Sequence, residues 1–247
     1  FGGPATLVAG KAGGLDLIAS DAPHLYDRPG NPYLGPDGKD WPDNAQRFAA
    51  LSRAAAEVAR GIIPGYQPDV LHLHDWQAAL ASAYVKFLGG PKTLLTVHNI
   101  AFQGQFPASI FASLQLPAAA FAIDGVEYYG SVSFLKGGLA TANAISTVSP
   151  SYAQEICTPD YGMGLDGLLR ARHAVLSGIV NGIDAAVWNP ADDRGIAATY
   201  TAKTLNRPGL QKALAALESG EAEGLLVAKL DRLTRSVRDL GSLLVSH

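Results

Sequence analysis

The chain has 247 residues, which is enough for one large domain or two small ones. Because 48% of the residues are hydrophobic and 17% are charged, wholesale disorder is excluded. A formal net charge of −3 gives no basic excess for chain-wide nucleic-acid binding, and no apolar run approaches the roughly 20 residues of a membrane span. The one cysteine, Cys157, excludes an internal disulfide, and with no signal peptide in view it predicts a cytoplasmic protein. The start at Phe1 leads us to expect a piece of something longer.

Residues 21–44 are crowded with Pro, Gly, Asp and Asn, which predicts a long irregular loop. Asp43 or Asn44 can then cap a helix that we expect to end at Gly65 and Pro68. The apolar residues of this helix step by three and four, as one helical face does. They are Phe48, Leu51, Ala55, Val58 and Ile62.

Predicted strands alternate with predicted helices through the rest of the body of the chain. The strands are expected at residues 70–74, 93–97, 144–148 and 174–180. The helices are expected at residues 76–88, 134–143 and 165–172, and one more begins with Ser149 as N-cap and Pro150 at its first position. This alternation predicts an α/β fold with a Rossmann-like, mainly parallel sheet.

Polar residues follow these strands at their carboxyl ends, where open parallel sheets bind their ligands. His74 and Asp75 follow the first strand, His98 and Asn99 the second, and Ser149 and Asn181 the third and fourth. These side chains hydrogen-bond sugars or phosphates well, and Trp76 adds an apolar face for a sugar ring. We interpret His72 as a core histidine and His98 as a functional one, because His98 opens the irregular segment HNIAFQGQF.

Two other kinds of site are not expected. His72 and His74 share one face of a strand, but no third ligand has a clear spacing, so we predict no metal site. Residues 162–167 match G-x-G-x-x-G, yet they follow CTPDY and not a strand, so a dinucleotide fingerprint is not expected. Cys157 is expected in the core.

Several long motifs match one enzyme family. DAPHLYDRPGNPY at 21–33, PDVLHLHDWQAAL at 68–80, TVHNIAFQGQFP at 96–107 and GIVNGIDAAVWNP at 178–190 resemble bacterial glycogen (starch) synthase. This is the ADP-glucose-dependent family of retaining glucosyltransferases, and the resemblance covers residues from about 15 to 205. It implies that residues 1–205 form the N-terminal, acceptor-side half of a GT-B glycosyltransferase, truncated at its start.

The resemblance also implies roles for individual residues. His98 would bond the donor glucose and steady the developing charge, and Asp75 and Trp76 would shape the glucose and acceptor pocket. Asn99 and Asn181 would hold the donor sugar or its phosphates, and Tyr33 is a weaker pocket candidate. The reaction would move glucose from ADP-glucose to the end of an α-1,4-glucan with retention, using no metal and no cofactor.

The chain departs from the family pattern in two places. Lys11 imitates the family's diphosphate-binding K-x-G-G-L loop, but only five residues separate Leu15 from Asp21, so we interpret Lys11 as a coincidence or at best a weak ligand. The second domain, with its cationic diphosphate clamp, is not expected within these residues. We therefore expect very weak or no synthase activity from this chain alone.

Residues 206–247 resemble a fragment of the serine recombinase catalytic domain. No Phe, Tyr or Trp follows Tyr200, and we expect a small α/β tail with a helix through Leu210, Leu214 and Leu217 and a strand at 224–228. In LDRLTRS, the resemblance places Asp231, Arg232 and Arg235 around a scissile phosphate. The recombinase serine segment is not present upstream, so DNA is not expected as a partner. The alternatives to a synthase are a recombinase-derived DNA-binding fragment and an inert fusion product.

Overall fold

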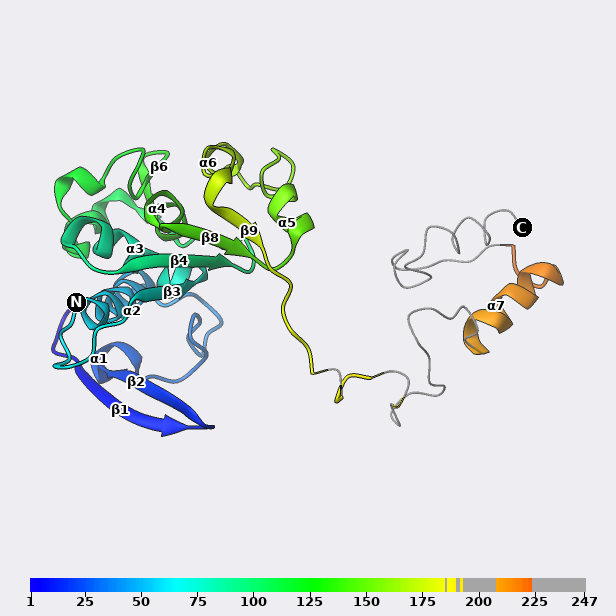
Figure 1. Cartoon of the computed structure of the whole chain (residues 1–247), viewed down its shortest axis with the longest axis horizontal. Helices are drawn as coiled ribbons and strands as arrows, with labels where there is room; N and C mark the ends of the chain where they lie inside the picture. The colour runs from blue at the N-terminus through cyan, green and yellow to red at the C-terminus, as the bar shows by residue number, and fades with distance from the viewer. Residues whose placement is uncertain (185, 190–191, 193–207, 224–247) are drawn as a thin grey trace. The chain divides into compact units, whose positions relative to one another are not determined.

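The computed structural model describes residues 1–184, 186–189, 192 and 208–223. It divides into two compact units, Phe1–Asn181 and Gly182–His247 (Figure 1). The boundary predicted near residue 206 falls outside the described residues and stays a prediction.

The first unit is built on a four-stranded parallel sheet, as the alternating pattern predicted. Its strands are β3 (Val70–His74), β4 (Lys92–Val97), β8 (Ala144–Thr147) and β9 (Leu176–Gly178), in the order β3-β4-β8-β9. β9 is shorter than the predicted strand at 174–180, because residues His173–Val175 form a turn of 3₁₀ helix before it.

One face of this sheet carries the core. Leu73 pairs with Leu95, and Leu95 pairs with Ile145, so three apolar side chains lie in one row across the strands, each at most 2% exposed. The helices α3 (Asp75–Leu88) and α4 (Phe134–Thr141) contribute to the same core (Figure 1). Both helices lie where the sequence predicted them.

The opposite face carries a polar row. His74 pairs with Thr96, and Thr96 pairs with Ser146 in the next strand. These residues alternate with the apolar row because successive side chains of a strand point to opposite faces. The sheet therefore presents histidine and hydroxyl groups on the side away from α3 and α4.

The predicted helix after the irregular loop is α2 (Asn44–Ala59). It begins as expected but ends earlier than Gly65, because the chain turns at Gly61, which has a φ of +93°. The predicted apolar face is partly wrong: Leu51 is 40% exposed and Ile62, beyond the helix, is 58% exposed. The buried side is instead rich in small residues, and it contains Ala45, Ala49, Ser52, Ala56 and Ala59.

Residues 21–44 are largely irregular, as predicted, with one short helix, α1 (Pro23–Tyr26). Arg47 is 5% exposed and ties this segment to α2. Its Nε donates to the carbonyl of Leu25 at 2.9 Å, and its Nη1 donates to the carbonyl of Pro32 at 2.9 Å. A buried guanidinium thus fixes the loop that carries Tyr33.

The hairpin of β1 (Thr6–Ala12) and β2 (Leu15–Asp21) was not predicted from the sequence. Gly13 and Gly14 have φ values of +57° and +79°, which suit a two-residue turn between antiparallel strands. Lys11 lies in this hairpin, and its Nζ is 2.9 Å from the carboxylate of Asp16 with both side chains exposed.

A small antiparallel sheet was also missed. It consists of β5 (Gln105–Pro107), β7 (Ser131–Ser133) and β6 (Glu127–Tyr128), in that order. The segments between the strands contain two stretches of 3₁₀ helix, Ala108–Leu114 and Ala118–Ala120. This sheet holds the segment after His98 in place.

The remaining helices agree with the sequence. In α5 (Pro150–Glu155), the Ser149 side chain accepts a hydrogen bond from the Tyr152 N–H at 3.0 Å, which confirms the predicted cap. The predicted helix at 165–172 is α6 (Asp166–Ala171). Cys157 is half-buried at the rim of the core.

In the second unit, α7 (Pro208–Glu218) confirms the predicted helix through Leu210. The predicted strand at 224–228 and the residues Asp231, Arg232 and Arg235 lie outside the described residues. Within the described ranges, no helix is long and apolar enough to cross a membrane.

Candidate functional site

The carboxyl edge of β3 and β4 brings His98 and Asp75 together. The His98 backbone N–H donates to Asp75 Oδ1 at 2.7 Å, and His98 Nε2 lies 3.0 Å from His74 Nδ1. Asp75 has a φ of +53°, a left-handed conformation that non-glycine residues seldom adopt. The strand-to-helix turn is therefore strained at the residue whose carboxylate holds the His98 peptide.

Trp76 belongs to an aromatic wall beside this edge. Its ring packs edge-on against Phe48 with centroids 4.5 Å apart, and its centroid is 6.2 Å from that of Tyr33. Gly104 has a φ of +56°, and a Cβ there would lie 2.3 Å from the Trp76 ring. Trp76 is only 9% exposed and belongs mainly to the core, yet it also lines the cavity described next, so its predicted role in the pocket stays a prediction.

A cavity of about 620 Å³ opens in front of this wall. It is lined by aromatic rings and side-chain amides, and the one charged residue of the lining is Asp40. Tyr33 and Phe102 are its exposed rings, with 39% and 63% of their surface accessible. The amide-bearing residues are Asn44, Gln77, Gln103 and Gln105.

Hydrogen bonds orient several of these amides. Gln77 Nε2 donates to Tyr33 Oη at 2.7 Å, and Gln103 Nε2 donates to the carbonyl of Met163 at 2.9 Å. Gln105 Nε2 donates to Gln103 Oε1 at 2.7 Å. None of these glutamines was predicted as a site residue, although Gln103 and Gln105 lie in the irregular segment HNIAFQGQF that follows the second strand.

Asn99 and Asn181, the two asparagines predicted for the site, follow different strands of the sheet. Asn99 is exposed next to His98, and its Oδ1 accepts from the Ala101 N–H at 3.0 Å. Asn181 follows the end of β9, and β8 separates β9 from β4, so the shared role of Asn99 and Asn181 stays a prediction.

His72 is exposed, so its interpretation as a core histidine is wrong. Its Nε2 lies 2.7 Å from Thr96 Oγ1, and Thr96 Oγ1 lies 2.6 Å from Ser146 Oγ. Partial burial lowers the pKa of His72, and His74 and His98 lower it further. Among the described residues, no group of three or more His, Cys, Asp or Glu is arranged to hold a metal ion.

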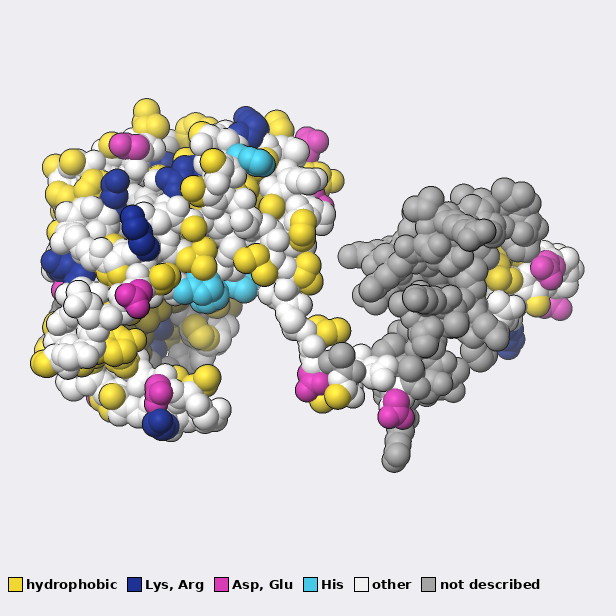
Figure 2. Space-filling view, viewed as in Figure 1, with side chains coloured by type: hydrophobic (Ala, Val, Ile, Leu, Met, Phe, Trp, Pro, Cys, Tyr) yellow, Lys and Arg dark blue, Asp and Glu magenta, His cyan; other side chains and the backbone are white. Residues whose placement is uncertain are grey.

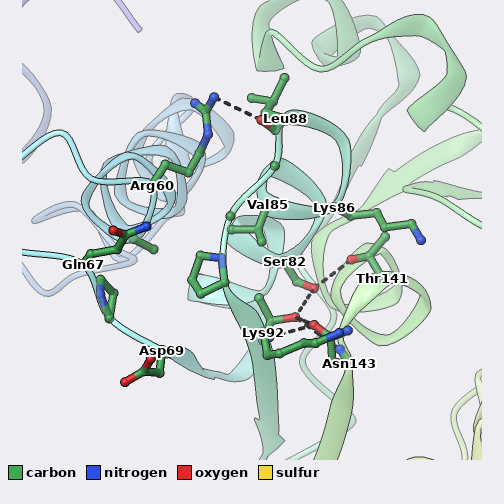
Figure 3. A pocket seen from close by; sticks show the side chains of 16 residues that line it. Arg60, Gln67, Asp69, Ser82, Val85, Lys86, Leu88, Lys92, Thr141 and Asn143 are labelled. Atoms are coloured by element: carbon green, nitrogen blue, oxygen red, sulfur yellow. Dashed lines mark hydrogen bonds between the residues drawn. The ribbon is translucent and has the colours of Figure 1, made fainter.

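A larger cavity, of about 930 Å³, lies at the opposite edge, where β3 and β4 begin (Figure 3). Its polar side chains are bonded among themselves: Thr141 Oγ1 donates to Ser82 Oγ at 2.9 Å, and Asn143 Oδ1 accepts from the Thr93 N–H at 2.8 Å. Arg60 there donates to the Leu88 carbonyl at 3.1 Å. Ligands of open parallel sheets bind at the carboxyl ends, so size does not make this cavity the better candidate.

Known proteins with similar sequences show the family to which the chain belongs. The model of the starch synthase catalytic domain matches residues 3–171. The chain belongs to this family. A glycogen synthase from Rhodopseudomonas palustris is 55% identical over 239 residues, and glycogen synthase 1 from Rhizobium meliloti is 56% identical over 241 residues. Each of these matches covers 95% of this chain, so the resemblance seen in the motifs is confirmed.

A solved structure agrees with the fold. The catalytic domain of starch synthase IV from Arabidopsis thaliana, bound to ADP and acarbose, superimposes with a TM-score of 0.62 at 30% identity. The match covers 91% of this chain and 46% of that one. The described α/β unit is thus the N-terminal half of a GT-B fold.

Two further facts concern the extent of the chain. It spans about half the length of the curated glycogen synthases it matches. The model of the resolvase N-terminal domain matches residues 189–246, which agrees with the resemblance noted for the tail.

Proposed function

We propose that this chain supplies the glucan-acceptor side of a glycogen synthase active site. The complete site transfers glucose from ADP-glucose to the 4-hydroxyl at the end of an α-1,4-glucan, with retention at the anomeric carbon. The observation that carries the proposal is the cavity in front of the aromatic wall, with its exposed rings of Tyr33 and Phe102 and its oriented amides.

The lining of this cavity suits an uncharged sugar chain. Aromatic rings bury the apolar faces of sugar rings, while amides donate to and accept from hydroxyl groups. Asp40 brings one negative charge to the lining, which disfavours a phosphate there. An α-1,4-glucan matches this chemistry better than a nucleotide does.

The donor sugar is proposed to lie beside His98. Asp75 fixes the His98 peptide through a 2.7 Å hydrogen bond, so the ring and the backbone carbonyl of His98 are presented in a set orientation. Such preorganised groups stabilise charge that develops in a transition state. We propose that Asn99 and Asn181 act on the same donor and that the reaction takes place in the cytoplasm.

The diphosphate of ADP-glucose needs cations that the candidate cavity does not offer. Lys11 is paired with Asp16 in the hairpin, and the lining of the candidate cavity contains no Lys or Arg. We therefore propose that the chain alone binds glucan but turns over ADP-glucose very weakly or not at all.

Calorimetric titration with a maltooligosaccharide and, separately, with ADP-glucose tests the proposal. We expect binding of the maltooligosaccharide, and we expect Phe102→Ala to weaken it by about tenfold. Tyr66→Ala is the matched control, because Tyr66 is also exposed but lies outside this cavity. Absence of maltooligosaccharide binding, or equal losses in the two variants, would contradict the proposal.

A DNA-binding role for residues 189–246 is the competing proposal. Phosphate contacts make DNA binding depend strongly on salt, so a salt-sensitive shift of duplex DNA by the chain would favour it. We expect no such shift, because the recombinase-like segment follows synthase sequence in place of the recombinase serine segment.

A further inference from the structure

Three imidazole rings stand side by side on the polar face of the sheet, where Figure 2 shows a group of exposed histidine side chains. The ring centroids of His72 and His74 are 4.3 Å apart, and those of His74 and His98 are 5.3 Å apart. His74 Nδ1 and His98 Nε2 lie 3.0 Å from each other, within hydrogen-bond distance. The family roles considered above assign nothing to His74.

A hydrogen bond between two imidazoles constrains their protons. One of the two nitrogens must carry the proton and the other must offer its lone pair, and this choice fixes what the remaining nitrogen of each ring can do. Neutral histidine in water prefers the tautomer with its proton on Nε2. If both rings keep that tautomer, His98 Nε2–H donates to the lone pair of His74 Nδ1, and neither ring has to adopt its less stable form.

We propose that His74 is a positioning residue that holds His98 as the Nε2–H tautomer, leaving the lone pair of His98 Nδ1 free to accept from a ligand hydroxyl. With this tautomer, His98 Nδ1 accepts a hydrogen bond from a sugar hydroxyl. It forms none with an ionised phosphate oxygen, because neither atom carries a proton. The site therefore selects a hydroxyl-bearing group at this position. This consequence for the ligand rests on the proposed function, but the tautomer itself does not.

The charged and titratable groups around His74 and His98 have hydrogen-bond partners of their own. His72 covers one side of the His74 ring and is itself engaged, with Nε2 at 2.7 Å from Thr96 Oγ1. The Asp75 carboxylate accepts from the His98 backbone N–H and so is directed at the peptide. Across the sheet, β4 and β8 present the hydroxyls of Thr96 and Ser146 and no charge to this row.

Nitrogen NMR of the whole chain, labelled at its six histidines, reads the tautomer directly. Two-bond proton–nitrogen correlations at neutral pH distinguish a protonated Nε2 from a protonated Nδ1, and the His98→Ala variant assigns the signals. We expect His98 to show a protonated Nε2 and a bare Nδ1 with no exchange between the two forms. A protonated Nδ1 on His98, or the mixture found in free histidine, would overturn the proposal.

Two amide replacements of His74 test whether an acceptor at the place of Nδ1, and not merely a side chain of similar size, holds the His98 tautomer. Asn at this position places its amide near the place of His74 Nδ1, and Gln places its amide near the place of His74 Nε2. We expect His74→Asn to keep the His98 tautomer and His74→Gln to release it into exchange. Because His74 is exposed, both variants should melt as the parent does. An unchanged His98 spectrum in His74→Gln would also overturn the proposal.

Titration with a maltooligosaccharide and with ADP-glucose, followed on the same spectra, separates the two proposals. If neither sugar binds while the tautomer is as expected, the proposed function fails and the role of His74 stands. If a sugar binds but the tautomer is wrong, the role of His74 fails and the proposed function stands. If both hold, we expect the sugar that shifts the His98 signal to bind about fivefold to tenfold more weakly to His74→Gln than to His74→Asn.

Discussion

The strained turn at Asp75 offers a sharp test of how the site is held. Asp75 combines a φ of +53° with a 2.7 Å hydrogen bond from the His98 N–H to its carboxylate. Three replacements separate the two features. Gly accepts the backbone conformation but has no carboxylate, Ala has neither advantage, and Asn tolerates the conformation and keeps a side-chain oxygen at the same place.

The expected losses follow from these two features. A hydrogen bond to a charged acceptor contributes about 1.5–3 kcal/mol, and the partial exposure of Asp75 favours the low end of this range. Ala at a positive φ adds about 1 kcal/mol of backbone strain. We therefore expect unfolding free energies to fall by about 2–3 kcal/mol in Asp75→Ala, by about 1–2 kcal/mol in Asp75→Gly and by less than about 1 kcal/mol in Asp75→Asn.

Urea unfolding followed by tryptophan fluorescence measures these losses, because Trp76 is adjacent to the mutated residue and mostly buried. The informative result is the order of stability, in which Asp75→Asn is the most stable variant, Asp75→Gly is intermediate and Asp75→Ala is the least stable. If Ala proves as stable as Gly, the strain argument is refuted. If Asp75→Asn proves as unstable as Asp75→Gly, the hydrogen bond from the His98 peptide does not stabilise the turn.

Two further predictions concern the packing behind the site. A Cβ on Gly138 would lie 2.9 Å from the carbonyl oxygen of Ala79, so Gly138→Ala should destabilise the unit by about 1–3 kcal/mol in urea unfolding. The control Gly167→Ala, at an exposed helical glycine, should instead stabilise it by up to about 1 kcal/mol. Lys136 Nζ donates to the Gly125 carbonyl at 2.8 Å, so Lys136→Met should cost about 2–4 kcal/mol. Because burial lowers the pKa of Lys136, the folded unit releases this proton before the unfolded chain does, and the stability of the parent relative to Lys136→Met should rise as pH approaches 10.5.

The main sheet could be predicted from the sequence, because its strands are short apolar runs separated by helical patterns. The errors concerned where helices end and where a hairpin turns. Gly61 ends α2 before the apolar repeat reaches Ile62, and periodicity cannot show that a chain has turned. The hairpin β1–β2 has exposed apolar residues on both strands, so no alternation marked it as a strand pair.

The candidate site was predicted only in part, for a different reason. His98 and Asp75 are brought together by the general rule for carboxyl ends of parallel strands, which needs no side-chain detail. Phe102 and the glutamines depend on the path of an irregular segment held by a separate small sheet, which local patterns do not reveal. The burial of Trp76 also could not be foreseen, because it depends on the approach of Gly104 to its ring.

The wall of the candidate cavity is held by contacts within the first unit. Arg47, buried under the irregular loop, donates to the Pro32 carbonyl and to Asn44 Oδ1, and Asn44 Nδ2 donates in turn to the Tyr33 carbonyl at 3.0 Å. The wall that faces the cavity is thus held by the Arg47 guanidinium, although Arg47 does not line the cavity. No comparable set of cations lines the described cavity for a diphosphate. The fixed wall and the absence of Lys and Arg from the lining of this cavity are the reasons why we propose that the chain holds a glucan without completing the transfer.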